Sequence, residues 1–298
     1  MQRETPLPIP AAYAFVVLVW STTPLAIQWS STTMSPITSV TIRMLASLVI
    51  IMAVARQFGI YELRLAQNWK LYLSSALGIC PAMPLVYLGA QHIPSGLVSV
   101  LFGLSPFLVG LLSGVIANDH SMTKGRYLAL LVAVAGLATI FLQGDELGPT
   151  APLGITLLLG AVCCFSMSSL FVKRYAANVE PVRQLWGSLS FASLMLVVIW
   201  LVFDRSTPQA FTYQSGISLA YLAVVGSVFG FLGYFYLIQR ISVNLVSLIP
   251  LVTPALALYL GFVLNGEQLS LRIVAGSGLI LLGLGLFNYF RPRRVRRG

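Results

Sequence analysis

One charged side chain lies deep inside a long apolar stretch of this sequence. Arg43 falls in the stretch 37–56, and none of the eight Asp and Glu residues falls in any long apolar stretch. A charge at the centre of a bilayer is unfavourable by roughly 3 kcal/mol unless it faces a cavity or a partner. Two roles for Arg43 stay open: a cation that meets a carboxylate in a cavity, or an arginine that bonds backbone carbonyls of an unwound helix.

Polar and aromatic residues recur in the same apolar stretches and could line a cavity together with Arg43. Trp20 and Phe165 occupy matching places in the first and sixth stretches. A cavity with aromatic walls and few charges suits a small amphipathic solute, although each residue alone fits a packing or membrane-interface role equally well. The candidate lining residues are Trp20, Thr23, Tyr87, Gln91, Ser99, Phe165, Ser169, Gln184, Trp186, Tyr234, Gln239 and Thr253.

Prolines mark places where these stretches could bend. Each proline removes one backbone hydrogen bond and frees a carbonyl, which lipid tolerates only where protein or a cavity satisfies that carbonyl. The candidate hinges are Pro24, Pro84, Pro106 and Pro254. A static kink explains any one of them as well, but Pro106 and Pro254 occupy equivalent positions in a repeat, which favours motion there.

That repeat is the strongest pattern in the chain. Residues 91–112 align without a gap with residues 239–260, 148 positions further on, and eight of the 22 positions are identical. The offset is about half of the 298 residues, so the sequence predicts two related units, residues 1–147 and 148–298. An apolar unit that is duplicated in this way is typical of secondary transporters, which bind their solute between the halves.

Composition predicts an all-α integral membrane protein. Hydrophobic residues make up 57% of the chain and charged residues only 9%, against about 25% charged residues in ordinary soluble domains. Apolar stretches long enough to cross a bilayer recur throughout. The ten expected spans are 11–29, 37–56, 70–91, 94–117, 125–142, 152–173, 183–203, 216–239, 242–264 and 271–290.

Lysines and arginines set the expected orientation. With the N-terminus inside, fifteen of them fall in inner loops and ends, and only Arg205 and Arg272 fall in outer loops. This asymmetry favours cytoplasmic N- and C-termini, in the cell inner membrane if the source is bacterial. Because each unit has five spans, an odd number, the second unit must cross the membrane inverted relative to the first, as alternating access requires.

The motifs resemble those of the drug/metabolite transporter superfamily, in particular the EamA-type permeases. The resemblance rests on VWSTTPLAIQW, on PITSVTIRMLASLVI and on the Ser-Pro segment within 87–116. It rests also on the Pro, Gly-Glu and glycine-rich pattern within 236–287, and it covers nearly the whole chain. The sequence departs from the family pattern at Asn118-Asp119-His120 and at Gly266-Glu267-Gln268, and we expect these helix-end segments to affect packing.

The resemblance implies ten helices as two inverted five-helix repeats. It implies that helices one to four and six to nine surround a central cavity, with helices five and ten at the periphery. It also implies export of amino acids or other small metabolites. We therefore expect a transporter of small metabolites, with amino acids first, that works by alternating access. Nucleosides, drugs and lipid-linked substrates are the alternatives, together with a non-transporting membrane subunit.

Other function classes find little support in the sequence. An intramembrane enzyme would need clustered His, Asp, Glu or Cys in the spans, and these are missing, so we expect no enzyme activity, metal or cofactor. The basic C-terminal tail suits cytoplasmic topology and contact with membrane lipids better than nucleic acid. His92 could relay protons, but its place at a helix end favours an interface role. A monomer and a homodimer both fit.

Overall fold

The structure is a computed structural model that describes residues 8–116, 122–141, 147–175, 179–208, 211–241, 246 and 249–290. Every regular element in this part of the chain is a helix. The elements are α1 (Ile9–Ser30), α2 (Pro36–Gln57), α3 (Leu65–Leu77), α4 (Ala82–Gly89), α5 (Ser95–Phe102), α6 (Ser105–Ile116), α7 (Lys124–Phe141), α9 (Ala151–Tyr175), α10 (Pro181–Phe203), α11 (Tyr213–Tyr221), the π-helical segment η1 (Leu222–Phe229), α12 (Gly230–Arg240), α14 (Ile249–Asn265) and α15 (Leu271–Tyr289).

These elements form the ten expected membrane spans, and three spans are interrupted. The third span divides into α3 and α4, the fourth into α5 and α6, and the eighth contains η1 between α11 and α12. Eight spans reach at least 18 residues with enough apolar character to cross a membrane, and a shorter apolar helix covers Val252–Asn265. The predicted residues 242–245, at the start of the ninth span, lie outside the described part.

Local sequence explains where several helices begin and end. Ser35, Thr212 and Ser270 precede α2, α11 and α15, and each side chain accepts a hydrogen bond from the backbone N–H three residues later. Such caps satisfy donors that have no partner within the helix. Gly266 follows α14 with a φ of 62°, a conformation that glycine adopts without steric penalty.

The packing of the helices repeats between the two halves. α1 packs against α12 and α14, and α9, the equivalent first helix of the second half, packs against α4 and α6. α2 contacts η1 and α10 contacts α3, which are again equivalent pairs. Since each half contains five spans, the second half is inverted relative to the first. Most of these contacts join one half to the other, so the centre of the molecule is an interface between repeats.

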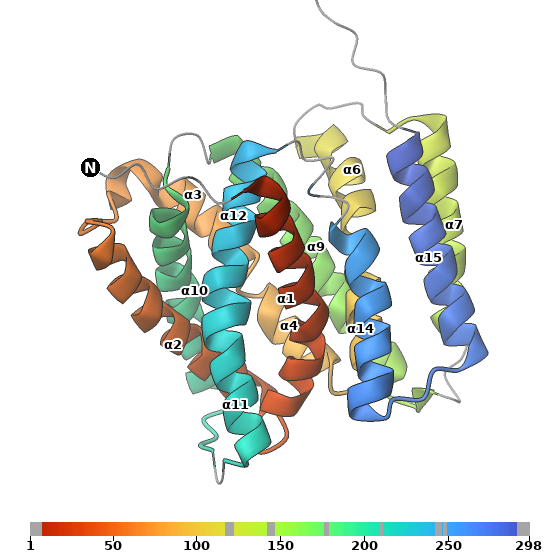
Figure 1. Ribbon diagram of the computed structural model, residues 1–298, viewed down its shortest axis with the longest axis horizontal. Coiled ribbons are helices and arrows are strands. Elements are labelled where there is room, and N and C mark those ends of the chain that lie inside the picture. Colours follow the sequence, from red (N-terminus) through yellow and green to blue (C-terminus); the bar gives the residue numbers. More distant parts are fainter. Residues whose placement is uncertain are drawn as a thin grey trace, which may run out of the picture.

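The fifth and tenth spans, α7 and α15, form a separate pair at one edge of the molecule (Figure 1). Glycines allow their close approach, because a Cβ on Gly136 would lie 2.5 Å from the Gly276 carbonyl oxygen. Gly283 also packs closely on α7, whereas Gly278 and Gly285 face open space. Small residues at helix interfaces are typical of membrane helices. Of the four glycines in α15, Gly276, Gly278, Gly283 and Gly285, two therefore allow close helix packing.

Candidate functional site

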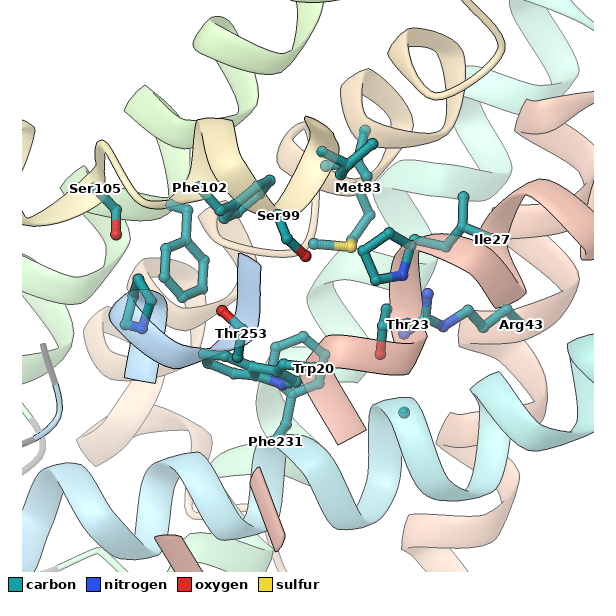
Figure 2. Close-up of a pocket in the computed structure, with 16 residues that line it drawn as sticks. Trp20, Thr23, Ile27, Arg43, Met83, Ser99, Phe102, Ser105, Phe231 and Thr253 are labelled. Carbon is teal, nitrogen blue, oxygen red and sulfur yellow. The ribbon is translucent and has the colours of Figure 1, made fainter. Parts of the chain in front are cut away.

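A cavity of about 100 Å³ lies at the centre of the interface between the halves (Figure 2). Its lining residues come from α1, α2, α4, α5, α6, α9, η1, α12 and α14. None of these lining residues belongs to α7 or α15, in agreement with the peripheral position expected for the fifth and tenth helices. On this volume scale one water needs roughly 10–15 Å³. The cavity therefore has room for several waters or one small solute.

Arg43 reaches this cavity from the middle of α2. Its side chain is buried, with 1% exposure. Nε donates to Ser227 Oγ at 2.9 Å, Nη1 donates to Tyr87 Oη at 3.3 Å, and the guanidinium carbon lies 5.9 Å from the Tyr87 ring centroid. These partners are hydroxyl groups, and no carboxylate of the described residues pairs with Arg43. The positive charge is therefore held in place without being neutralised.

The π-helical segment η1 shapes the wall beside Arg43. π-Helical turns are rare and occur often at functional sites. The Ser47 hydroxyl lies 3.0 Å from the Ala223 carbonyl oxygen, so a polar contact ties α2 to η1. Gly226 leaves room for the guanidinium, because a Cβ there would stand 3.2 Å from Arg43 Nη2.

An aromatic cluster covers another wall of the cavity. The ring of Trp20 lies 6.1 Å from that of Phe165 and 5.3 Å from that of Tyr234, measured between centroids. Phe102 joins the cluster from α5, 5.8 Å from Phe165. These edge-to-face and tilted pairs have the geometries that aromatic quadrupoles favour. The cluster gives the cavity a firm apolar wall that draws on both halves.

Six of the predicted lining residues line this cavity: Trp20, Thr23, Arg43, Ser99, Phe165 and Thr253. Two more lie directly behind the wall. Tyr87 holds Arg43, as described above, and Tyr234 packs on the aromatic cluster while its hydroxyl lies 3.1 Å from Ser169 Oγ. Ser169 therefore sits one layer further out.

Two predicted residues lie elsewhere. Gln91 lines a second, more open cavity of about 430 Å³ beside Gln28 and His92. Gln239 donates to the Val179 carbonyl at 3.0 Å and to Gln184 Oε1 at 3.3 Å. Both glutamines stand near the ends of their spans, where the repeat pattern is strong but the central cavity does not reach. Gln184 and Trp186, which we also considered from the sequence, do not line either cavity.

The candidate hinge prolines fall into two groups. Pro24 and Pro254 lie inside α1 and α14, where each leaves the carbonyl four residues earlier without its helical donor. Those carbonyls belong to Trp20 and Pro250, and both residues line the cavity. Pro84 and Pro106 lie in the first turns of α4 and α6, where a proline removes no helical hydrogen bond. The third and fourth spans are instead interrupted just before these prolines, between α3 and α4 and between α5 and α6.

Several contributing residues escaped the sequence analysis. Ser227 anchors Arg43, and Ser105, Phe102 and Phe231 line the cavity. Ser105 was detectable, since it stands 148 positions before Thr253 and therefore occupies the equivalent place in the repeat. The sequence alone did not identify Ser227, Phe102 and Phe231, because the directions in which they face depend on the break after Phe102 and on the segment η1.

A polar network joins the two halves at one end of the central cavity. Trp29 Nε1 donates to Asn265 Oδ1 at 2.9 Å, and Gln28 Nε2 donates to the carbonyls of Ala90 and Ile93. Glu267 Oε1 accepts the Ser95 backbone N–H at 3.0 Å. Gln28 directly follows the cavity residue Ile27, and Ser95 stands one helical turn before the cavity residue Ser99. Glu267 belongs to one of the two segments that depart from the family pattern. The second such segment, Asn118-Asp119-His120, lies outside the described residues.

Within the described ranges, no group of three or more His, Cys, Asp or Glu side chains has a geometry that could hold a metal ion. The cavity therefore offers one cation, several hydroxyls and aromatic faces. Such a set recognises an amphipathic solute with an anionic group through hydrogen bonds and burial.

Comparison with known proteins agrees with this architecture. The sequence profile of the EamA-like transporter family matches residues 10–142 and 152–289. An uncharacterized transporter of Bacillus subtilis, YvbV, is 26% identical over 81% of this chain and 78% of its own length. A probable terminal-alkyne amino-acid exporter of Streptantibioticus cattleyicolor is 25% identical over 83% of this chain and 82% of its own. A protein of known crystal structure shares the fold, with a TM-score of 0.66 at 16% identity over 93% of this chain and 95% of its own.

The family profile matches twice, once in each half, and together the two matches cover most of the chain. The helices, the repeat and the profile thus lead to one conclusion: this multi-pass membrane protein belongs to the EamA-like transporter family.

Proposed function

We propose that this protein exports small amphipathic metabolites that carry a carboxylate, with amino acids as the first class. The observation that carries the proposal is Arg43, the one charged side chain among the residues that line the central cavity. It is buried, and among the described residues its side chain hydrogen-bonds only to hydroxyls. A buried guanidinium without a protein anion favours a bound anion, which a carboxylate supplies with two matching oxygens.

The rest of the cavity supports the same substrate class. Its walls are mostly apolar and aromatic, and none of the lining residues is Asp or Glu. A cationic solute would be repelled by the positive charge of Arg43 and would find no carboxylate among the lining residues, so the cavity disfavours organic cations. The probable terminal-alkyne amino-acid exporter of Streptantibioticus cattleyicolor resembles this chain over four fifths of both lengths, and this likeness favours amino acids over other carboxylates.

Alternating access between the inverted halves is the proposed mechanism. The cavity lies between α1, α2, α4, α5 and α6 of the first half and α9, η1, α12 and α14 of the second. Relative movement of two inverted repeats opens such a cavity to one side and then to the other. The network of Gln28, Trp29, Asn265 and Glu267 would have to separate for the cavity to open at its end.

Orientation follows from charge in this proposal. The concentration of lysines and arginines in one set of loops favours cytoplasmic N- and C-termini. The protein would then reside in the cytoplasmic membrane, with the Gln28–Glu267 network at its outer end. Cysteine labelling of loop positions such as Arg205 and Lys124 from either side of intact cells would test this orientation.

Counterflow in proteoliposomes tests the function. Vesicles loaded with one unlabelled amino acid at a time would be assayed for uptake of its radiolabelled form, with wild type, Arg43→Gln, Arg43→Lys and Arg56→Gln. Arg56 lies on the same helix, exposed at its end, so it controls for loss of a positive charge on α2. We expect saturable exchange of several amino acids, loss of at least tenfold with Arg43→Gln, partial retention with Arg43→Lys and no change with Arg56→Gln.

Two results would contradict this proposal. One is folded wild-type protein that exchanges no amino acid, which would direct the search to nucleosides, drugs and lipid-linked compounds. The other is undiminished exchange by Arg43→Gln, which would leave Arg43 with a purely structural role.

A further inference from the structure

Three hydroxyl groups in the central cavity have no hydrogen-bond partner in the described part of the protein. Ser99, Ser105 and Thr253 are 5%, 7% and 6% exposed, and all three line the cavity. A buried hydroxyl that loses its water without gaining a partner destabilises the protein by roughly 1–3 kcal/mol. Three such groups around one cavity indicate that something else bonds them, either water or a ligand.

Many other helical hydroxyls in this chain donate to a backbone carbonyl of their own helix. Thr23, Ser47 and Ser169 each donate to the backbone carbonyl four residues earlier, at 2.7 to 2.9 Å. The same local bond satisfies Thr41 and Ser188. This back-bonding is the ordinary way in which serine and threonine are accommodated within a helix. The hydroxyls of Ser95, Ser193 and Ser277 also lack a partner in the described part of the chain, but these three do not line the central cavity. What distinguishes Ser99, Ser105 and Thr253 is that they gather around one cavity.

Two of the three stand at irregular points of the backbone. Ser105 is the first residue of α6, directly after the break that follows α5, so no helical turn precedes it. Thr253 directly precedes Pro254 inside α14. Ser105-Pro106 and Thr253-Pro254 occupy equivalent positions in the repeat, 148 residues apart. Each half thus contributes one hydroxyl at its Ser/Thr-Pro step to the same cavity.

These hydroxyls lie apart from Arg43. In Figure 2 the guanidinium of Arg43 stands at one end of the cavity and Ser105 at the other, with Ser99 and Thr253 between them. Phe102 lies beside Ser105, and Trp20 lies near Thr253. A solute that spans the cavity would place its carboxylate at Arg43, its apolar middle on the aromatic wall and its far end at the hydroxyls.

We propose that Ser105 and Thr253, with Ser99 between them and Arg43, form a second polar subsite that selects the far end of the substrate. The inference rests on the proposed function, since it takes the carboxylate at Arg43 as the other contact. The substrate class is a small carboxylate with an uncharged hydrogen-bonding group, such as a hydroxyl or an amide, at the end remote from the carboxylate. Analogues in which a methyl group replaces that polar end leave the hydroxyls unpaired and bind more weakly.

The test compares solutes of equal shape that differ only at the far end. Homoserine with norvaline, and asparagine with leucine, are such pairs. Each would compete, unlabelled, against the amino acid that wild type exchanges best in counterflow. We expect the polar member to compete about tenfold better than its apolar partner, because a site built to bond a polar group discriminates strongly against an analogue that lacks it.

Variants then assign the preference to the subsite. Thr253→Val keeps the side-chain shape, and the double variant Ser105→Ala, Thr253→Val removes both repeat-related hydroxyls. We expect the ratio of competition by the polar member to that by the apolar member to fall toward one in the double variant. We expect the ratio to persist in Thr253→Ser. Thr156→Val is the matched control, because Thr156 is an exposed helical threonine that donates to the Pro152 carbonyl. Arg43→Gln should weaken competition by both members of a pair to the same degree.

The outcomes separate the two proposals. Equal competition by the members of each pair in wild type, or an unchanged preference in the double variant, would overturn the hydroxyl subsite and leave the carboxylate role of Arg43 intact. Absence of amino-acid exchange by folded wild type would overturn the proposed function itself. A preference that survives in Arg43→Gln at undiminished affinity would retain the subsite and reject Arg43 as the carboxylate contact.

Discussion

The two halves of the molecule share one scaffold, but only the first half places a charge in the cavity. Arg43 lies on α2, seven residues after Pro36, and the equivalent position on α10, seven residues after Pro181, is Ser188. Ser188 is fully buried and its hydroxyl donates to the Gln184 carbonyl at 2.5 Å. The same helix position therefore binds its own backbone in one half and faces the cavity in the other.

The surroundings of these two positions also correspond. Gly226 stands beside Arg43, and Gly78, 148 positions earlier, stands beside Ser168. The segment η1 in the eighth span matches the interruption between α3 and α4 in the third. Both halves thus have an irregular backbone at the level of the cavity. Duplication therefore accounts for the shared framework and opening, while single substitutions made the site asymmetric and gave it a positive charge.

The largest effect is expected when the second half receives its own arginine at the position equivalent to Arg43. Ser188→Arg would place an unpaired guanidinium where the side chain has 0% exposure. A buried charge without a partner destabilises a protein by about 3–5 kcal/mol, so we expect little folded protein and no added transport. Thermal unfolding in detergent measures the effect, and a stable, fully active variant would show that both halves offer the same opening.

The next comparison uses the paired glycines. A Cβ on Gly78 would lie 2.7 Å from Ser168 Oγ, whereas a Cβ on Gly226 would lie 3.2 Å from Arg43 Nη2. We expect Gly78→Ala to lower stability by about 1–3 kcal/mol through overpacking without altering substrate preference. Gly226→Ala should instead displace the guanidinium and raise KM for exchange. Equal KM effects of the two variants would remove the distinction between the halves.

A smaller effect is expected where the first half has a hydroxyl and the second does not. Ser47 lies 3.0 Å from the Ala223 carbonyl, and its counterpart on α10 is Ala192. Ser47→Ala makes the two helices alike at this position and removes a hydrogen bond worth about 1 kcal/mol. Equilibrium unfolding measures the loss, with Ala192→Ser as the reciprocal variant, for which no corresponding gain is expected.

The smallest effect concerns the helix starts. Ser35 caps α2 and also bonds Asp204 of the other half, whereas Glu180 precedes α10 and bonds Arg183 at 2.9 Å. That hydrogen bond holds the pKa of Glu180 below its ordinary value. A lowered folded-state pKa contributes stability above the unfolded pKa, and the contribution is lost as pH falls through the folded pKa.

Because Glu180 is exposed, the contribution should stay below about 1 kcal/mol. Glu180→Gln should therefore flatten the acid limb of the stability profile slightly and leave exchange unchanged. Stability measured from pH 7 down to pH 3 checks this, and a loss of exchange at neutral pH would assign Glu180 a role beyond the helix start.

Much of this architecture was predictable because it follows from composition and repetition. Apart from the start of the ninth span, which lies outside the described residues, the span limits lie within about five residues of the predicted ones. The residues at mid-span that pointed to a cavity, such as Arg43, Trp20 and Thr253, do line one. The repeat located Pro106 and Pro254 at equivalent sequence positions, although Pro106 lies in the first turn of α6 and Pro254 inside α14.

The remainder depended on tertiary structure. The breaks after Leu77 and Phe102 and the π-helical turns of η1 rotate later residues relative to a regular helix. Tyr234 consequently packs behind Trp20 instead of lining the cavity, and Ser227 turns toward Arg43. A sequence pattern with a period of 3.6 residues holds only while the helix is regular, so it misses residues that follow such breaks.

The most direct test of the central claim is whether Arg43 recognises a carboxylate. Competition in counterflow would compare the best amino acid with its own amide, which keeps the side chain and the amine but lacks the negative charge. If Arg43 binds the carboxylate, the amide competes at least tenfold more weakly in wild type, and Arg43→Gln removes this difference. An amide that competes as well as the acid in wild type would contradict the account.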